Sequence, residues 1–496
     1  MSERLEDVIK IRKEKLERIK QAGLDPYPSS SSRTHTNSQA LDDFEALTET
    51  PITLVGRIRS WRDMGMIIFA HIEDGTAKIQ VLMKSDDLGE DNFKFALKNL
   101  DLGDFVEVTG KLFKTKTDEK TLLTTSYQLL AKSLLPLPSE HFGIHDEETR
   151  LRKRYLDILS NDDTKQLFIK KARFWNSMRD FLQTRGFLHM DMPILESTTG
   201  GAEARPFITH HNALDRDFYL RISLELPLKK MLVAGYEKIF EIGRIFRNEG
   251  ISTEHLQDYT QMEFYWAYAS FEDLMKFVQE MYQKIITDTF GSLSITARGQ
   301  TVDWSGEWKK ISYIELFKKH TGIDLLKTTD DELKSHLDKK KVKYEPYAGR
   351  GRLIDLIFKE VRDKIPNDKP VFLIDQPVEL EPLAKRDPKN PKLVQRLQII
   401  AYGTELGKGF GELNDPIDQR MRFEEQVKLR QAGDEEAQML DESYVEAMEY
   451  GMPPAAGFGL SERLFAILAD KSIRETVVFP LMKENTSNLR KERINE

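Results

Sequence analysis

Two stretches near the middle of the chain alternate apolar side chains with charged, polar or aromatic ones at the period of a β-strand. The first has Phe240, Ile242 and Phe246 on one face, and Glu241, Arg247 and Glu249 on the other. The second has Met262, Phe264 and Trp266 on one face, and Tyr259, Gln261, Glu263 and Tyr265 on the other. A polar loop that holds His255 joins them. The pattern predicts a β-hairpin with one face in a core and the other on a polar site.

Residues 52–130 have a different texture, because short strand-like runs follow one another with turn signals such as Asp74-Gly75 between them. The runs are residues 52–61, 66–74, 77–83, 104–115 and 121–130. A helical stretch at 91–99 is inserted between the third run and the fourth. Five short strands with one inserted helix are typical of a small Greek-key barrel of the oligonucleotide-binding type.

The rest of the chain is dominated by helical spacing. Residues 3–20 form a charged helix with a narrow apolar stripe, which either leans on the body of the protein or contacts a polyanion. Residues 25–38 are predicted to be a flexible linker. Helices at 150–160 and 168–187, the second ending at Gly186, begin a long alternation of helices and buried strands. We therefore divide the chain into an N-terminal helix and linker (1–50), a barrel (51–138) and a large α+β domain (139–496).

Two further segments embed charge in apolar surroundings. Pro193 interrupts the strand-like run 186–195, which predicts that this run lies at a sheet edge or an interface. In residues 457–468, two glycines precede a helix with Arg463 near its start. Glycines at such a place permit a close approach of the backbone to other groups.

Composition narrows the class of protein. With 496 residues, the chain exceeds the roughly 250–300 residues at which single cores stop growing. It contains no cysteine, which excludes disulfides and thiolate chemistry and suits a reducing cytoplasm. No apolar run approaches the ~18 residues of a membrane span, and the densely charged start gives no secretory signal. A net charge of −8 excludes a protein that is basic overall, but not a local basic patch. We expect a cytoplasmic protein with no membrane partner.

Common nucleotide and metal motifs are absent from the sequence. The run GTELGKGF at 403–410 lacks the Ser or Thr that follows the lysine of a P-loop, and neither G-x-G-x-x-G nor H-E-x-x-H occurs. His210 and His211 have no clear third ligand nearby, so we interpret them as hydrogen-bonded structural histidines. A nucleotide enzyme with this sequence must therefore bind phosphate by other means.

The segments at 186–195, 244–266 and 457–468, in this order, resemble the three signature motifs of class II aminoacyl-tRNA synthetases. Four further segments narrow the resemblance to the lysyl-tRNA synthetases: GGAEARPFITHHNALDRDFYLRISLEL, FRNEG, MEFYWAYA and GELNDPIDQRMRF. The resemblance extends from about residue 50 to the end of the chain. It implies an OB-fold barrel that binds the anticodon, followed by a class II catalytic domain with an antiparallel sheet flanked by helices.

The reaction implied by the resemblance is activation of L-lysine with ATP, followed by transfer to the 3′ end of tRNA(Lys). A carboxylate attacks the α-phosphorus, so the site needs positioned cations, and arginine suits phosphate because of its fixed fork. The resemblance assigns the α-phosphate to Arg247, the adenine and outer phosphate to Arg463, the other adenine face to Tyr259 and the β- or γ-phosphate to His255. Glu249 completes the implied ATP site and, with the two arginines, the catalytic set. The residues alone leave open a salt bridge between Arg247 and Glu249, and an exposed position for His255.

A lysine substrate brings an ammonium group, which a dry pocket has to meet with carboxylates. By resemblance, Glu225 and Glu412 surround this ammonium, with Tyr265 beside them. Glu263 and the backbone of Gly201 hold the substrate α-amino group. An aspartyl- or asparaginyl-type synthetase is the nearest alternative, but it would need a cationic pocket, and no arginine replaces either glutamate.

The family uses Mg²⁺, and two positions of this chain depart from the family pattern. Gln398 replaces a usual glutamate ligand, whereas Glu405, the second usual ligand, is retained. Lys408 stands where the family usually has asparagine, and it either replaces part of the metal interaction or pairs with Glu405. We hypothesise fewer bound Mg²⁺ ions, with Lys408 nearer the phosphates than the substrate ammonium.

In the barrel, the resemblance places Phe69, Gln80 and Glu119 where the family reads a uridine-rich anticodon. Positive charge and a further stacking surface come from Arg57, Arg59, Arg62 and Trp61. The apolar neighbours of Phe69 leave open that it is a core residue instead.

The resulting prediction is a homodimeric lysyl-tRNA synthetase, since motif 1 with its proline builds a subunit interface in this class. A catalytically silent tRNA-binding relative is an alternative from another class, although Arg247, Glu249 and Arg463 argue against it. A general single-strand binder that uses only the barrel would leave the large C-terminal domain unexplained.

Overall fold

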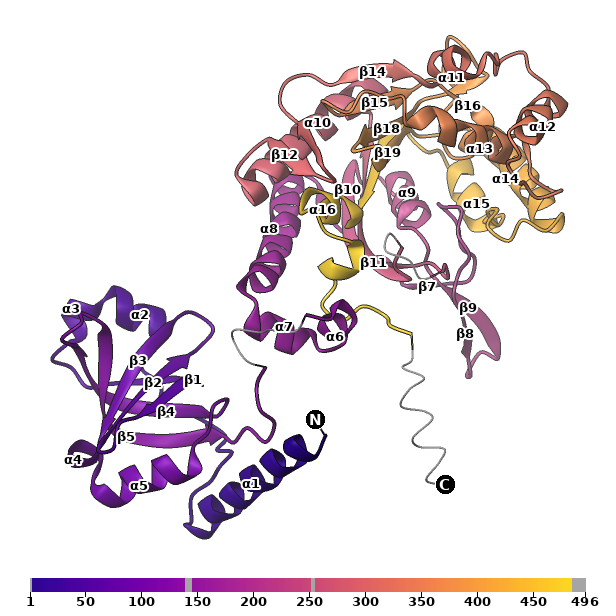
Figure 1. Ribbon diagram of the computed structural model, residues 1–496. Helices are drawn as coiled ribbons and strands as arrows, with labels where there is room; N and C mark the ends of the chain where they lie inside the picture. Colours follow the sequence, from indigo (N-terminus) through magenta and orange to yellow (C-terminus); the bar gives the residue numbers. More distant parts are fainter. Residues whose placement is uncertain (1, 139–144, 251–254, 484–496) are drawn as a thin grey trace. The chain divides into compact units, whose positions relative to one another are not determined.

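The computed structural model describes residues 2–138, 145–250 and 255–483. The chain divides into two compact units, residues 1–144 and 145–496 (Figure 1). The domain boundary expected at 138/139 adjoins residues 139–144, which lie outside the described residues. Among the helices of the described ranges, none combines the length and the apolar character needed to cross a membrane.

The five predicted strands of the first unit close into a barrel in the order β1-β2-β3-β5-β4. The strands are β1 (Ile52–Asp63), β2 (Ile67–Glu73), β3 (Lys78–Lys84), β4 (Phe105–Lys114) and β5 (Lys120–Ala131). Strands β3 and β5 pair in parallel, and the other neighbours are antiparallel. The predicted helix at 91–99 is α5 (Glu90–Asn99), preceded by the short α4 (Ser85–Leu88). Fully buried Leu54, Ile72, Val81, Val108 and Leu122 fill the interior, as the alternation of the strands predicts.

The N-terminal helix α1 (Ser2–Gln21) packs against the barrel. The Arg12 guanidinium donates to the backbone carbonyls of Leu135 at 2.9 Å and Leu102 at 3.0 Å, and Ile19 joins the barrel core. This agrees with a helix that leans on the body of the protein. Helices α2 (Asn37–Asp42) and α3 (Phe44–Leu47) follow. Part of the predicted linker is tied to the barrel, because the Thr34 N–H donates to the Thr53 carbonyl at 3.0 Å.

The second unit is built on an eight-stranded sheet in the order β14-β15-β18-β19-β20-β11-β10-β6. Its strands are β6 (Leu188–His189), β10 (Lys238–Phe246), β11 (Asp258–Ala267), β14 (Lys309–Ser312), β15 (Val371–Ile374), β18 (Arg396–Ala401), β19 (Thr404–Gly411) and β20 (Ala455–Ser461). All neighbours are antiparallel except the outermost pair at each edge. The predicted hairpin is β10–β11, in which Glu241 lies opposite Glu263, and β6 lies at the sheet edge as Pro193 predicted.

Helices cover both faces of this sheet (Figure 1). On one face, α8 (Asp162–Thr184) and α10 (Phe271–Phe290) bury Phe240, Met262, Phe264 and Phe458. On the other, α9 (Glu225–Val233), α14 (Pro416–Gln431) and α15 (Glu442–Glu449) pack around Ile239, Ile245 and Tyr265. A third cluster joins α11 (Tyr313–Thr321), α12 (Asp330–Lys339) and α13 (Arg350–Arg362) to β15. Helices on the second face leave part of the sheet uncovered, and the polar site lies there.

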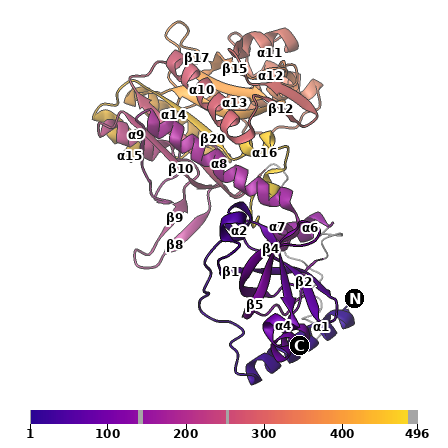
Figure 2. The same ribbon diagram turned by 90° about the vertical axis from the view of Figure 1, so that its left-hand side faces the viewer.

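Smaller elements complete the unit. They are β7 (Leu195–Glu196), β8 (Ile208–His211), β9 (Arg216–Leu220), β12 (Ser294–Ala297), β13 (Gln300–Asp303), β16 (Gln376–Pro377), η1 (Val378–Leu380), β17 (Leu393–Val394), α16 (Arg463–Leu468) and η2 (Ile473–Thr476). The β8–β9 hairpin projects from the body of the second unit in both views (Figure 2). It carries His210, whose Nδ1 lies 2.9 Å from Asp217 Oδ1, in agreement with a hydrogen-bonded structural histidine.

The helical stretch predicted at 150–160 is present, but it is divided into two helices, α6 (Glu147–Arg152) and α7 (Arg154–Ser160). Lys153 between them leaves helical geometry, with φ −114° and ψ 46°. The break lets Arg150 and the buried Arg154 both reach Asp157, at 2.9 and 2.7 Å. Helix α8 ends as predicted, with Gly186 in the left-handed region at φ 83°.

Candidate active site

One pocket on the exposed part of the sheet gathers every residue predicted to contact ATP, lysine or metal. The predicted residues in its lining are Gly201, Glu225, Arg247, Glu249, His255, Tyr259, Glu263, Tyr265, Glu405, Glu412 and Arg463. They come from β11 and β19, from the starts of α9 and α16, and from the segments around these elements. Residues up to 262 positions apart in the chain, Gly201 and Arg463, thus share one surface. The hairpin predicted only that one of its faces lies on a polar site, and Tyr259, Gln261, Glu263 and Tyr265 of that face line the pocket; the wider grouping is the one that the family resemblance implied.

Glycines in β20 make room for the side chains of the neighbouring strands. A Cβ added at Gly457 would lie 2.5 Å from the Tyr265 ring and closer still to Glu412 Oε1. One added at Gly459 would lie 3.2 Å from Glu263 Cγ. The close approach predicted for the glycine pair is therefore present, and it lets the carboxylates lie against the sheet backbone.

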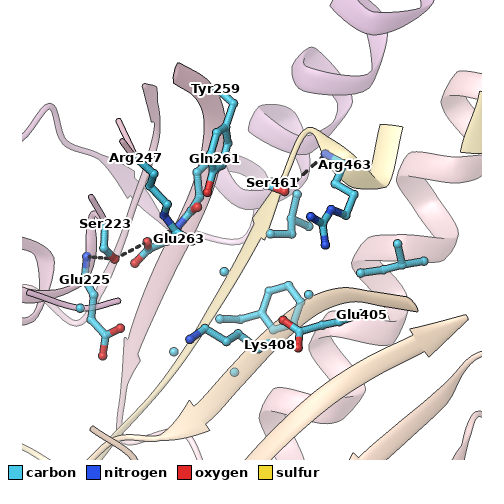
Figure 3. A pocket seen from close by; sticks show the side chains of 18 of the residues that line it. Ser223, Glu225, Arg247, Tyr259, Gln261, Glu263, Glu405, Lys408, Ser461 and Arg463 are labelled. Atoms are coloured by element: carbon cyan, nitrogen blue, oxygen red, sulfur yellow. Dashed lines mark hydrogen bonds between the residues drawn. The ribbon is translucent and has the colours of Figure 1, made fainter. Parts of the chain in front are cut away.

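Two arginines approach the pocket from opposite sides (Figure 3). The Arg247 Nε donates to the Ile222 carbonyl at 3.3 Å, and its guanidinium carbon lies 5.8 Å from the Tyr259 ring centroid. No carboxylate among the described residues forms an ion pair with Arg247, so the alternative salt bridge with Glu249 is absent there. Arg463 is the first residue of α16, and its N–H donates to Ser461 Oγ at 3.4 Å.

Carboxylates form another part of the lining, and a lysine that the sequence analysis missed lies between them. Glu225 and Glu412 are 3% and 0% exposed. The fully buried Lys229 donates to Glu225 Oε1 at 2.5 Å and forms an ion pair with Glu412 Oε2. Burial raises the pKa of Glu225 to about 7 and that of Glu412 to about 8, while Lys229 lowers both. Burial alone would lower the pKa of Lys229, but the two glutamates raise it well above its usual value.

Glu263 differs from these two because neutral donors surround it. Its Oε1 accepts from Ser223 Oγ at 2.8 Å (Figure 3) and from the Leu224 N–H at 3.0 Å. Its Oε2 accepts from the Tyr265 hydroxyl at 2.7 Å. Gly201 lies close by with φ +82°, and a Cβ there would be 2.8 Å from Ser223 Oγ. The glycine therefore fits a backbone that has to pass close to Ser223, which donates to this carboxylate.

The residues at the expected metal site contact other side chains of the protein. Gln398 donates from Nε2 to Glu405 Oε2, and Gln398 Oε1 accepts from Gln376 at 3.1 Å. Lys408 Nζ pairs with Glu381 Oε2 at 3.5 Å, and not with Glu405 as one alternative had it. Among the described residues, no group of three or more His, Cys, Asp or Glu side chains has the geometry to hold a metal ion. Glu405 nevertheless lines the pocket and is one oxygen ligand of the kind that Mg²⁺ uses together with nucleotide phosphates.

A second pocket, in the barrel, contains all four predicted anticodon residues, Arg62, Phe69, Gln80 and Glu119, together with Trp61. Phe69 is half-buried, outside the barrel core, so the alternative of a core residue is wrong. Arg57 and Arg59 are not in this lining: Arg57 donates to the Gly103 carbonyl at 3.1 Å, and Arg59 pairs with Glu73 at 3.0 Å.

A hydrogen-bonded chain crosses the barrel pocket and includes a histidine that the sequence analysis did not single out. His71 Nε2 lies 2.9 Å from Glu119 Oε1, and Gln80 Nε2 donates to Glu119 Oε2 at 2.7 Å. Thr121 Oγ1 in turn donates to Gln80 Oε1 at 2.7 Å. The alternation of β2 carried the signal for His71, because it puts residues 69 and 71 on one face.

An antiparallel sheet that presents positioned arginines, carboxylates and glycines to one pocket can bind a triphosphate beside an amine without forming a covalent bond. Together with a five-stranded barrel, this fold and site define the class II aminoacyl-tRNA synthetases.

Comparisons with known proteins agree. The family described as tRNA synthetases class II (D, K and N) matches residues 146–483, and an OB-fold nucleic acid binding domain matches residues 52–137. A lysine–tRNA ligase of Pelotomaculum thermopropionicum is 42% identical over 97% of this chain and 96% of its own length. Those of Carboxydothermus hydrogenoformans and Bacillus subtilis are 43% and 39% identical, over 97% of this chain and 98% of their own lengths. The chain belongs to the lysine–tRNA ligase family.

Proposed function

We propose that this chain activates L-lysine with ATP and transfers the lysyl group to the 3′ end of tRNA(Lys). The observation that carries the proposal is a single pocket lined by two buried glutamates, Glu225 and Glu412, and by two arginines, Arg247 and Arg463. Glu412 Oε1 is buried and accepts no hydrogen bond from any described residue. A buried carboxylate oxygen of this kind calls for a cationic donor, which the substrate side chain supplies.

In the first step, an oxygen of the lysine carboxylate attacks the α-phosphorus of ATP. A new P–O bond forms, the bond to the bridging oxygen breaks, and pyrophosphate leaves with that electron pair. Arg247 binds the α-phosphate and the substrate carboxylate, which brings two anions together, and Arg463 and His255 hold the outer phosphates. Tyr259 and Arg463 lie on the two faces of the adenine ring. Glu263 and Gly201 hold the α-amino group, and Glu225, Glu412 and Tyr265 hold the side-chain ammonium.

The test is ATP–pyrophosphate exchange with each of the twenty amino acids in turn. Exchange with L-lysine above all others supports the proposal. Exchange with aspartate or asparagine would establish the aspartyl- or asparaginyl-type alternative, which the two glutamates disfavour. Failure with all twenty would leave a catalytically silent tRNA-binding relative.

Mg²⁺, when bound with ATP, neutralises phosphate charge and orients the triphosphate. We expect Glu405 to hold it, with Gln398 engaging one oxygen of that carboxylate and the Lys408 ammonium supplying a fixed positive charge in the same pocket. Fewer ions should bind than in a site with two glutamates. Titration of exchange activity against free Mg²⁺, compared with direct Mn²⁺ binding counted by electron paramagnetic resonance, checks this. Gln398→Glu is expected to add metal affinity, and an identical ion count and metal dependence in both proteins would end the hypothesis.

The barrel pocket is proposed to read the anticodon, with Phe69 stacking on a base and Gln80, Glu119 and Arg62 contacting base edges and phosphate.

A cytoplasmic location follows from the reaction, because tRNA is charged where translation consumes it.

A homodimer is proposed as the working assembly. The edge region of the second unit exposes apolar side chains: Leu188, Ile194 and Leu195 are 44–49% exposed, and Ile208 is 63% exposed. Such a patch next to an edge strand suits a subunit interface. Light scattering coupled to size exclusion measures the mass, and a monomer at micromolar concentration would contradict this assembly.

A further inference from the structure

Lys229 is a charged residue inside the catalytic unit that the reaction described above does not use. It lies one helical turn after Glu225 in α9, between Leu228 and the buried Leu232, and it is fully buried. Its Nζ contacts Glu225 Oε1 and Glu412 Oε2 and lies 5.8 Å from the Tyr265 ring centroid. Both glutamates line the pocket, whereas Lys229 is not among the described residues of that lining. The ammonium therefore stands behind the two carboxylates.

Lys229 contacts one carboxylate oxygen of each of the two glutamates. It engages Oε1 of Glu225 and Oε2 of Glu412. Glu412 Oε1 remains without a hydrogen-bond donor among the described residues, although the side chain is fully buried. One buried cation thus fixes both carboxylates and leaves an acceptor for a second one.

The charges of this region agree with such an arrangement. Glu225, Glu263 and Glu412 are buried carboxylates of the pocket lining, and the resident ammonium of Lys229 pairs with Glu225 and Glu412, which leaves two negative charges among the three. The next carboxylate outward, Glu381, lies between two cations, Arg396 at 3.7 Å and Lys408 at 3.5 Å, so it adds no uncompensated negative charge. L-Lysine brings two ammonium groups to these carboxylates, while its own carboxylate is assigned to Arg247, so the charges around the two amines balance. Without Lys229, three buried carboxylates would face two ammonium groups, and one of them would have to take up a proton.

We propose that Lys229 is a specificity-determining positioning residue, whose ammonium favours the ionised forms of Glu225 and Glu412 and leaves their other oxygens for one further ammonium. This rests on the proposed function, since the second ammonium is that of the substrate lysine. Removal of the charge is expected to raise the pKa of both glutamates, so that lysine has to displace a proton when it binds.

The experiment compares Lys229→Met with Lys230→Met, the same change at the next position of α9. Lys230 is only partly buried and donates to Ser443 Oγ at 2.7 Å. For Lys229→Met we expect the KM for lysine in the exchange reaction to rise about tenfold or more at pH 7.5, and to recover towards pH 9, since one pKa unit is a factor of ten. The KM for ATP should stay within about twofold. Calorimetry of lysine binding in two buffers of different ionisation enthalpy should show more protons released than in the unsubstituted protein.

Two further variants separate charge from structure. Lys229→Arg keeps the charge and should restore the proton count, and Lys229→Gln removes the charge but still donates a hydrogen bond. A folded Lys229→Met or Lys229→Gln protein with unchanged lysine KM, pH profile and proton release would overturn the proposal. So would equal rises in the lysine and ATP KM with no change in proton release, because that pattern marks a merely structural lysine.

If neither neutral variant folds, the unsubstituted protein decides by the same calorimetry at pH 8. Release of one proton or fewer per bound lysine supports a resident cation that favours the ionised form of the pair, and release of more than one contradicts it. The proposed function fails separately, if the unsubstituted protein does not activate lysine. If it does activate lysine while Lys229→Met behaves like Lys230→Met, only the present inference fails.

Discussion

At the scale of single residues, Arg247 shows how a charge on a strand face becomes part of a catalytic pocket. Its guanidinium is held by one backbone carbonyl and a nearby tyrosine ring, with no carboxylate partner among the described residues. Little folding energy depends on such contacts, so a loss of the side chain should be felt mainly in the reaction.

We predict that Arg247→Ala lowers kcat/KM for lysine-dependent exchange by about 10²–10³-fold, as expected for a donor that stabilises developing charge on phosphate. Arg247→Lys should recover only part of this rate, because an ammonium group lacks the fixed pair of donors with which a guanidinium binds phosphate. The control is Arg244→Ala, three residues earlier in β10, where Arg244 pairs with Asp258 at 2.7 Å and is not among the pocket residues. Exchange rates within twofold of each other for the two alanine variants, at equal melting temperature, would contradict the role.

The two buried glutamates predict a pH dependence. Burial raises the pKa of Glu225 to about 7 and that of Glu412 to about 8, against the opposing effect of Lys229. As the pH falls from 8 to 6 both carboxylates take up protons, and a protonated carboxyl no longer pairs with an ammonium. The KM for lysine should therefore rise by up to about tenfold per pH unit, while the KM for ATP changes little. Exchange kinetics from pH 6 to 9 measure this, and a flat lysine KM would refute it.

The same pKa values fix the sign of the effect on stability. They lie above the ~4.3 of a glutamate in an unfolded chain, so the folded protein binds these protons more tightly. The free energy of unfolding therefore falls as the pH rises from about 4.3, and the fall ends near pH 7 to 8, where the pair is ionised in the folded protein as well. Bound lysine offsets this loss, so its stabilisation in thermal unfolding should be larger at pH 8 than at pH 6.

Most residues that line the pocket could be predicted from the sequence, whereas the buried contacts behind the lining could not. The sequence alone places Glu263 and Tyr265 on one face of a strand, because strand side chains alternate strictly. Lys229 was missed because a glutamate and a lysine four residues apart are usually an exposed helical pair. Its apolar neighbours were the available signal. The partner of Lys408 is Glu381, 27 positions earlier, and no local pattern identifies such a contact.

At the scale of elements, the β10–β11 hairpin was predictable, but its end was not. Strand β10 ends at Phe246, so Arg247 and Glu249 lie beyond it. The side-chain alternation persists because the Arg247 N–H still donates to the Gln257 carbonyl at 2.8 Å. The pocket is therefore lined in part by residues that follow β10 and continue its side-chain alternation beyond the regular pairing with β11.

Helix α16 offers an element-scale prediction, because a buried ion pair anchors its start. Glu462, fully buried, accepts from Lys171 of α8 at 2.6 Å, and the same ammonium donates to the Thr476 carbonyl at 2.8 Å. Lys171→Met leaves a buried carboxylate without its cation, which costs about 3–5 kcal/mol. We expect a lower melting temperature and a raised KM for ATP, since Arg463 is the next residue.

Thermal unfolding and exchange kinetics check this against Lys170→Met, the neighbouring exposed lysine of the same helix. Lys171→Met combined with Glu462→Gln removes both charges and should regain part of the stability. A Lys171→Met protein as stable as Lys170→Met would show that the pair does not anchor the helix.

At the scale of the whole molecule, the division into a barrel and a large α+β unit could be predicted, because the length of the strands and the pattern of apolar and polar residues change between them. The order of strands in the large sheet could not. The parallel pairing of β14 with β15, and of β6 with β10, joins segments about 50 to 60 residues apart. Such neighbours depend on packing between distant segments, on which local spacing gives no information.

The two units predict two separable effects on the complete reaction. Activation of lysine needs only the pocket of the second unit, whereas charging of tRNA also needs the barrel. Phe69→Ala removes a stacking surface, and a stacked base contributes about 1–3 kcal/mol. We expect kcat/KM for tRNA(Lys) in aminoacylation to fall about tenfold or more in Phe69→Ala and in Glu119→Gln, while exchange without tRNA stays within about twofold. Leu102→Ala, an apolar truncation on the barrel outside the pocket, is the control. Equal losses in both reactions would mean that the barrel variants act through folding, and unchanged aminoacylation would remove the barrel pocket from anticodon recognition.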